Sequence, residues 1–212
     1  MDKPVIIFGA DSLGVAALEI FESNQIIIFG FLDDNPQWVG REIGDVSVLS
    51  GTDDQTYLKY IGQKCEAFIA SDDMSLRKSL VKTLNDQRKV MPVNAIHKTA
   101  WLSKYASIGH GNFINMGAKI GTKSSIGNHC IIHSNVTIDH NSTIHDYCQI
   151  GSGTIISTDV TLGKGSFIGA GSTIVSGVSI GKNARVGAGS VVIRNIKDNE
   201  TVFGNPAEKM PV

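Results

Sequence analysis

Histidine, the side chain best suited to proton transfer near neutral pH, is concentrated in one part of the sequence. Three of the six histidines, His133, His140 and His145, lie between residues 133 and 145. Asp139 directly precedes His140, and Asn141 follows it. An imidazole can act as a general acid or base, and several imidazoles together can bind zinc. The cluster therefore predicts either acid–base chemistry or a metal site.

A second stretch, near the N-terminus, has the residue types of a nucleotide site. The apolar run 4–8 leads into a loop with Gly9, Asp11, Ser12 and Gly14, and a second apolar run ends in Asp33, Asp34 and Asn35. A strand, a glycine loop and a helix, with an acidic residue about 20 positions further on, are typical of dinucleotide binding. Asp11, however, replaces the second glycine of that pattern. A turn in which Asp11 or Ser12 caps the helix is the alternative.

The first 95 residues are predicted to form a small α/β domain. Runs rich in apolar and β-branched residues at 4–8, 26–32 and 67–70 predict three buried strands, and helical patterns cover 15–21 and 76–84. Strands that alternate with helices indicate a parallel sheet of Rossmann type. Residues 1–95 are therefore expected to be a Rossmann-like nucleotide- or sugar-binding domain.

The second half of the chain has a repeat of six residues. Every sixth residue from Ile96 to Val192 is aliphatic, 17 positions without an insertion, and the residue four places further on is small or β-branched from Ala118 onward. A period of six fits neither a helix nor an isolated strand, but it fits a short strand followed by a corner. Three such units close one triangular coil. Residues 96–197 are therefore predicted to form a parallel β-helix of five to six coils.

Composition and charge exclude several classes of function. The net charge of −1 provides no general basic field for nucleic acid, although residues 1–95 carry −5 and residues 96–212 carry +4. No apolar run approaches the roughly 20 residues of a membrane span, and no long apolar stretch at the N-terminus resembles a secretory signal. Three cysteines without a CxxC motif argue against a disulfide framework. We expect a cytoplasmic protein that binds neither nucleic acid nor membrane.

The uninterrupted repeat resembles the hexapeptide-repeat acyltransferases, and its combination with a Rossmann-like N-domain resembles the bacterial sugar acetyltransferases among them. These include sialic-acid O-acetyltransferases and nucleotide-4-amino-sugar N-acetyltransferases. The resemblance implies a left-handed β-helix, a homotrimer, acetyl-CoA as co-substrate and a sugar or nucleotide-sugar acceptor. It covers essentially the whole chain.

The resemblance also implies a role for His140. In the family a histidine between acidic residues is the general base at the subunit interface, and it removes a proton from the sugar amine or hydroxyl. Here Asn141 stands where the second acid is expected, so Asp139, Asp146 or an acid of the neighbouring subunit would have to orient the ring. His145 replaces a glycine of the repeat, which favours contact with ligand or partner.

In the N-domain the resemblance assigns Gly9, Asp11 and Ser12 to the phosphates of a nucleotide. It assigns Asp33, Asp34 and Asn35 to the base and ribose. The family has Gly-Gly-His or Ser-Gly-His where this chain has Asp11, Ser12 and Leu13. A carboxylate would repel a diphosphate. Either Asp11 turns away as a helix cap, or the substrate is not a nucleotide sugar.

The C-terminal segment 198–212 resembles the tail that frames coenzyme A in this family. Its predicted cofactor-binding residues are Gly204, Asn205, Pro206, Ala207 and Lys209, with Glu208 inserted before the lysine. Arg194 and Lys209 are our candidates for the phosphates. Backbone amides around Gly169 and Gly187 are candidate donors to the thioester oxygen and pantetheine.

The sequence therefore predicts an acetyl-CoA-dependent sugar O- or N-acetyltransferase with His140 as base. No cysteine or serine is placed to form a covalent intermediate. One alternative is a zinc hydratase like the γ-class carbonic anhydrases, whose ligand spacing His140 and His145 resemble, with His110 or His133 as a third ligand. The others are a non-catalytic nucleotide-sugar-binding protein and an enzyme that uses another acyl donor.

Overall fold

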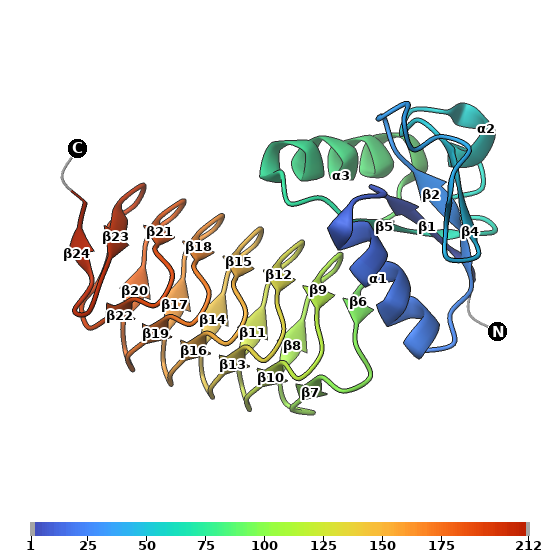
Figure 1. Cartoon of the computed structure of the whole chain (residues 1–212). Helices are drawn as coiled ribbons and strands as arrows, with labels where there is room; N and C mark the ends of the chain where they lie inside the picture. Colours follow the sequence, from blue (N-terminus) through green and yellow to red (C-terminus); the bar gives the residue numbers. More distant parts are fainter. Residues whose placement is uncertain (1–2, 211–212) are drawn as a thin grey trace. The chain divides into compact units, whose positions relative to one another are not determined.

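The computed structural model describes residues 3–210, which form two compact units divided between Lys98 and Thr99 (Figure 1). None of the helices among the described residues is long and apolar enough to cross a membrane.

The first unit contains a five-stranded sheet in the order β3-β4-β2-β1-β5. Its strands are β1 (Val5–Phe8), β2 (Ile28–Leu32), β3 (Glu42–Ile43), β4 (Val46–Ser50) and β5 (Glu66–Ile69); the short β6 (Ala95–Ile96), later in the chain, is not part of this sheet. Its helices are α1 (Ser12–Ser23), α2 (Gln55–Leu58) and α3 (Met74–Arg88). The core of this sheet is parallel, as predicted, because β2 and β5 flank β1 and β4 pairs with β2. The sequence reading missed the antiparallel β3–β4 pair.

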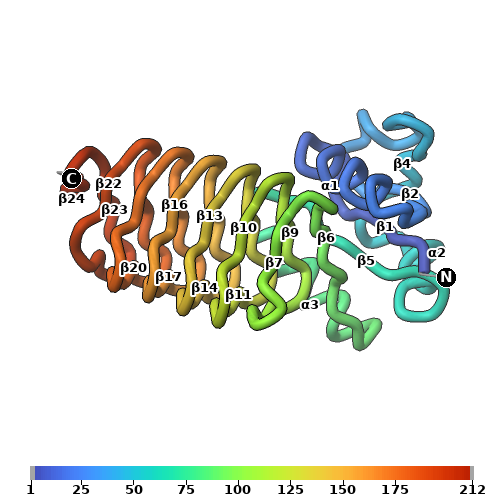
Figure 2. The backbone as a smooth tube through the Cα atoms, turned by 90° about the horizontal axis from the view of Figure 1, so that it is seen from below, coloured from blue at the N-terminus to red at the C-terminus, as the bar shows by residue number. Residues whose placement is uncertain are grey.

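The second unit is a parallel β-helix of short strands, two residues long from β7 to β22, that stack in three sheets (Figure 2). The first sheet contains β7 (Trp101–Leu102), β10 (Lys119–Ile120), β13 (Thr137–Ile138), β16 (Ile155–Ile156), β19 (Thr173–Ile174) and β22 (Val191–Val192). The second contains β8 (Ser107–Ile108), β11 (Ser125–Ile126), β14 (Thr143–Ile144), β17 (Thr161–Leu162) and β20 (Ser179–Ile180). The third contains β9 (Phe113–Ile114), β12 (Ile131–Ile132), β15 (Gln149–Ile150), β18 (Phe167–Ile168), β21 (Arg185–Val186), β23 (Thr201–Phe203) and β24 (Glu208–Lys209).

The register confirms the period of six. Each strand pairs in parallel with the strand three repeats away, as Ile120 does with Ile138 and Ile126 with Ile144. From Ile114 to Val192 the aliphatic residue at every sixth position is at most 3% exposed. Leu102 and Ile108 in the first coil are only half-buried. The parallel sheets and the repeat fit the left-handed β-helix that the resemblance implies.

Buried hydroxyl groups bridge successive coils, which explains the small polar residues of the second register. Ser142 Oγ donates to the carbonyl oxygen of Ser157 at 2.9 Å, and Ser172 Oγ donates to that of Gly187 at 3.0 Å. A buried hydroxyl needs such a partner, and only a short side chain fits beside the aliphatic residues. Cys130 and Cys148 occupy the same register as free, fully buried thiols.

Two corner positions have strict backbone requirements. The third residue of a corner is left-handed, as in Asn141 with φ 59° and Gly153 with φ 70°. The first residue needs room rather than a left-handed backbone, since a Cβ on Gly121 would lie 2.7 Å from the amide nitrogen of His140. Glycine at the first position therefore lets the corner of one coil pass closely over the next.

Candidate active site

The three clustered histidines lie on three different corners of the β-helix. His133 follows β12, His140 follows β13 and His145 follows β14, so each stands where the chain passes from one sheet to the next. Among residues 3–210 no group of three or more His, Cys, Asp or Glu side chains could hold a metal ion. The ligand set considered for zinc, with His110 or His133 as third member, is therefore not brought together within one chain.

His140 is paired with the carboxylate that precedes it. Its Nδ1 lies 3.0 Å from Oδ1 of Asp139, and its backbone amide donates to the same oxygen at 2.9 Å. These bonds from His140, first the backbone one and then the side-chain one, lower the pKa of Asp139 below its ordinary value. Both side chains are about half exposed. Asp139 thus holds the ring as an ionised acceptor, which leaves Nε2 free to act as a base when Nδ1 carries the proton.

Asn141 and Asp146, the other residues considered as partners of the His140 ring, do not contact it through their side chains in the bonds described. Asn141 is the left-handed corner residue, and its amide donates to the carbonyl oxygen of Thr122 at 3.0 Å. Asp146 lies on the next corner, where its Oδ1 accepts from the amide of Asn128 at 2.9 Å. Within one chain, Asp139 is therefore the acid that orients His140, and Asn141 shapes the turn.

His145 occupies the first position of its corner, where Gly109, Gly127 and Gly163 stand in other coils. Its side chain is exposed, and its carbonyl oxygen accepts from Sγ of Cys130 at 3.2 Å. The exposed position is compatible with the predicted contact to ligand or partner, which stays a prediction.

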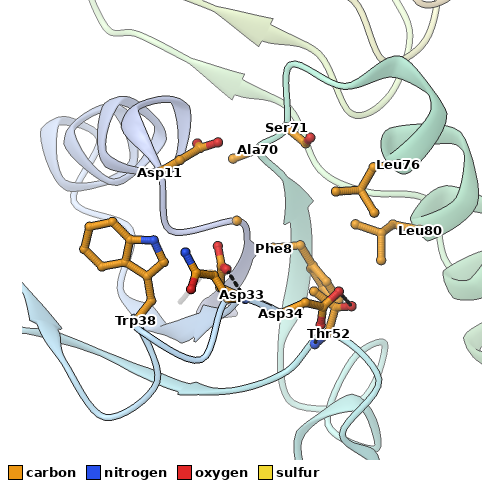
Figure 3. Close-up of a pocket in the computed structure, with 12 residues that line it drawn as sticks. Phe8, Asp11, Asp33, Asp34, Trp38, Thr52, Ala70, Ser71, Leu76 and Leu80 are labelled. Atoms are coloured by element: carbon orange, nitrogen blue, oxygen red, sulfur yellow. Dashed lines mark hydrogen bonds between the residues drawn. The ribbon is translucent and has the colours of Figure 1, made fainter.

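A pocket of about 290 Å³ lies at the carboxyl ends of β1, β2 and β5 in the first unit (Figure 3). Five predicted residues line it: Gly9, Asp11, Asp33, Asp34 and Asn35. Ser12, the first residue of α1, does not. The sequence reading missed the other main lining side chains: Phe8, Trp38, Thr52, Ser71, Leu76 and Leu80. An aromatic residue shortly after the acidic turn was a signal that could have identified Trp38.

Asp11 is the N-cap of α1, one of the two alternatives that the sequence left open. Its Oδ1 accepts from the amides of Leu13 at 3.1 Å and Gly14 at 3.4 Å. A phosphate bound at the start of this helix would need the same amides. In this chain a carboxylate already occupies them.

The acidic segment after β2 ties the surrounding loops together. Asp33 Oδ2 accepts from the amide of Ala10 at 2.7 Å, and its Oδ1 accepts from that of Asn35 at 2.8 Å. Asp34 accepts from both the amide and the hydroxyl of Thr52, at 2.7 and 2.9 Å. The carboxylates therefore fix the glycine loop and the mouth of the pocket. None of the described residues that line it is Lys or Arg.

At the C-terminal end, both predicted phosphate-binding cations have carboxylate partners. Arg194 Nη2 lies 2.6 Å from Oε2 of Glu208, the inserted residue, and Lys209 Nζ lies 3.9 Å from Oε1 of Glu200. The tail that contains Gly204, Asn205, Pro206 and Ala207 connects β23 to β24, an antiparallel pair. The amide of Ala207 donates to the carbonyl oxygen of Val191 at 2.8 Å, so the tail is fixed to the last coil.

The backbone amides around Gly169 and Gly187, which stay candidate donors, differ in their hydrogen bonds. The amides of Gly169 and Gly187 donate to Val186 and Val202 of the next coil, each at 2.8 Å, and are not available to a ligand. Ala170 and Ala188, which follow them, are exposed, and their amides make no hydrogen bond within residues 3–210. The amide of the first corner residue therefore belongs to the ladder between coils.

Residues 105–140, 141–176 and 159–194 match the family model described as bacterial transferase hexapeptide (six repeats). A search of the curated proteins finds no match. Among solved structures, perosamine N-acetyltransferase from Caulobacter crescentus, a histidine variant in complex with CoA and GDP-perosamine, is 27% identical, with a TM-score of 0.91 over 100% of this chain and 99% of that one.

Two further structures share the fold. The acetyltransferase domain of PglB from Neisseria gonorrhoeae, in complex with acetyl coenzyme A, is 21% identical, with a TM-score of 0.89 over 99% of this chain and 100% of that one. WeeI from Acinetobacter baumannii is 22% identical, with a TM-score of 0.86 over 98% and 99%. Residues 105–194 thus match the bacterial transferase hexapeptide model, and the whole chain shares the fold of the perosamine N-acetyltransferase from Caulobacter crescentus.

Proposed function

We propose that this protein is an acetyl-CoA-dependent acetyltransferase that acylates an amine of a nucleotide-linked amino sugar, with His140 as general base. The observation that carries the proposal is the His140–Asp139 pair, a half-exposed imidazole whose Nδ1 is held at 3.0 Å by an ionised carboxylate. The full-length similarity to an enzyme bound to CoA and GDP-perosamine supports the choice of an amine over a hydroxyl.

The acyl donor, when bound, supplies an activated thioester carbonyl. His140 removes a proton from the sugar amine through Nε2 as the amine nitrogen forms its bond to the carbonyl carbon. Asp139 stabilises the resulting imidazolium. As the carbon–sulfur bond breaks, His140 returns the proton to the leaving sulfur. The proton is thus passed on, and the enzyme ends in its starting state.

The residues of the later coils fit a coenzyme A thioester. Ala170 and Ala188 are exposed residues whose backbone amides make no hydrogen bond within residues 3–210, and they are candidate donors for an amide- and carbonyl-rich pantetheine arm. Arg194 and Lys209 provide the cations for the phosphates, once Glu208 and Glu200 release them or share them. We propose a homotrimer, in which the exposed corner of His140 faces a neighbouring subunit that completes the site.

The N-terminal pocket is proposed to bind the nucleotide part of the acceptor. Its carboxylates and hydroxyls suit ribose hydroxyls and base N–H groups, which are hydrogen-bond donors. The helix cap formed by Asp11 removes the conflict seen in the sequence, because the loop does not need to bind the diphosphate directly.

The test is release of free thiol from acetyl-CoA with a panel of GDP-, UDP-, dTDP- and CMP-linked amino sugars and free sialic acids. His140→Ala is expected to lower turnover at least about 100-fold and to leave the affinity for acetyl-CoA unchanged. His110→Ala is the matched control, since His110 is an exposed corner histidine outside the proposed site. Turnover retained in His140→Ala would remove His140 from the mechanism. Release with a sialic acid alone would change the acceptor from amine to hydroxyl.

A further inference from the structure

The N-terminal pocket has an aromatic wall that the nucleotide assignment above does not use. Trp38 is half-buried and lines the pocket on the side opposite Leu76 and Leu80 of α3 (Figure 3). Phe8, at the end of β1, lies between these two sides. The pocket is therefore bounded by an indole on one side and by aliphatic side chains on the other.

The segment that carries Trp38 is held in place by consecutive hydrogen bonds. Oδ1 of Asn35 accepts from the amide of Gln37 at 3.0 Å, and the carbonyl oxygen of Asn35 accepts from the amide of Trp38 at 3.0 Å. The amide of Gly40 donates to the carbonyl oxygen of Val48 in β4 at 2.9 Å. Because the backbone of this segment is already fixed, less conformational entropy is lost when a ligand packs on the ring.

The charges around the pocket are unevenly placed. The lining has three carboxylates, those of Asp11, Asp33 and Asp34, and no cation among its described residues. The guanidinium of Arg41, in contrast, lies 5.8 Å from the centre of the Trp38 ring. A flat, uncharged ring is therefore suited to the pocket itself, and a phosphate is suited to the Arg41 side.

We propose that Trp38 stacks on the nucleobase of the nucleotide-linked acceptor and that Arg41 beside it binds the phosphate. The inference rests on the proposed nucleotide-linked acceptor and identifies a base-binding residue of its pocket. The base lies between the indole and the Leu76–Leu80 side, while the carboxylates accept from the ribose. The phosphates leave the pocket beside Arg41.

Tryptophan fluorescence tests this proposal directly, because the protein has two tryptophans. Trp101 lies in the other unit and is 60% exposed, so Trp101→Phe leaves Trp38 as the only reporter. Titration with GDP or UDP is expected to change the emission of Trp38 with saturation. Ribose 5-phosphate, which has no base, is expected to give no change at the same concentrations. Saturable nucleotide binding, measured by calorimetry, without a change in this emission would overturn the stacking.

Affinities of point variants provide the second readout. Trp38→Ala is expected to weaken GDP and UDP binding by about 5- to 150-fold, whereas Trp38→Phe keeps most of the affinity. Val39→Ala, at the exposed neighbouring position, is the matched control and is expected to bind as the wild type does. Arg41→Gln is expected to bring the affinity for the nucleoside diphosphate close to that for the nucleoside. Equal affinities of Trp38→Ala and wild type would refute the proposal.

Binding is measured without acetyl-CoA, so the result is independent of the transfer reaction. If the wild type binds neither nucleotide yet acetylates a free sugar, the stacking proposal and the nucleotide-linked acceptor fail while the acetyltransferase stands. If nucleotides bind against Trp38 but no acceptor releases thiol, the stacking stands and the proposed transfer fails.

Discussion

The two candidate sites are positioned in different ways. In the β-helix, the place of a side chain follows from its number, because every strand pairs with the one three repeats away and every corner repeats the same backbone. In the first unit, the loops around the pocket are positioned by individual carboxylates, such as Asp33 on the amide of Ala10. A periodic scaffold tolerates a functional side chain at an exposed corner, whereas an irregular pocket depends on each of its polar contacts.

The comparison predicts its largest effect in the interior of the periodic unit. Ile144 is 1% exposed between Ile126 and Leu162 of adjacent coils, so Ile144→Ala is expected to lower the free energy of unfolding by about 2–5 kcal/mol. Thr143→Ala, at the outward residue of the same strand, is the matched control, with a loss of about 0.5 kcal/mol or less. Chemical denaturation measures both. Similar losses in the two variants would contradict the inside–outside alternation.

A smaller effect is expected at the corner that carries the proposed base. The pKa of Asp139 is lowered from its ordinary 3.8, so its carboxylate stays ionised above that pH and holds His140 throughout the range from pH 5 to 8. Asp139→Asn is therefore expected to lower kcat about 10-fold at pH 6, 7 and 8 and to leave the KM for acetyl-CoA unchanged. Partial recovery is expected in Asp139→Glu.

Steady-state kinetics at the three pH values measure this prediction. A fall in affinity for acetyl-CoA with an unchanged kcat would instead indicate that Asp139 shapes the corner without acting through His140. Since the depressed pKa means that Asp139 becomes half-protonated only below pH 3.8, no loss of activity between pH 8 and 5 is expected to come from this carboxylate.

The smallest effect is expected at Asp11, whose carboxylate binds the amides that a phosphate would otherwise use. Here the substitution is expected to strengthen binding rather than weaken it. Asp11→Gly removes the negative charge and the cap of α1, and glycine costs the helix only a few tenths of a kcal/mol. Nucleoside diphosphates are then expected to bind several-fold more tightly, because the freed amides and the helix dipole attract anions. Isothermal titration calorimetry measures the change. Asp54→Gly, which removes the cap of α2 instead, is the control. Weaker binding in Asp11→Gly would show that the carboxylate contacts the ligand.

Much of the β-helix could be predicted because its signal is repeated. The aliphatic period located every strand from β7 to β22. The same period also determines that His133, His140 and His145 fall on successive corners, although closeness in sequence had indicated a cluster. Each repeat turns the chain onto the next face, so residues that lie side by side in adjacent coils are three repeats apart in the sequence.

The rest depended on contacts that no periodic pattern carries. From the sequence, Arg194 is a candidate to bind phosphate and Glu208 is only an inserted residue. Their ion pair depends on how the tail folds back onto the last coil. The choice between the amides of Gly169 and Ala170 depends on which one the adjacent coil uses. Trp38 enters its pocket through a sequence of turns after β2, and such turns are set by local side-chain bonds rather than by hydrophobic alternation.

The uninterrupted register of three repeats per coil has a consequence for how such a chain can change in length during evolution. Insertion of three repeats adds one coil and moves everything beyond it by about 4.8 Å along the axis, with every corner kept in its orientation. Insertion of a single repeat rotates all later corners by one face instead. The distance between the His140 corner and the C-terminal tail can therefore lengthen or shorten only in whole coils. Insertion or deletion of one or two repeats would put a different corner on the face where the original corner lay.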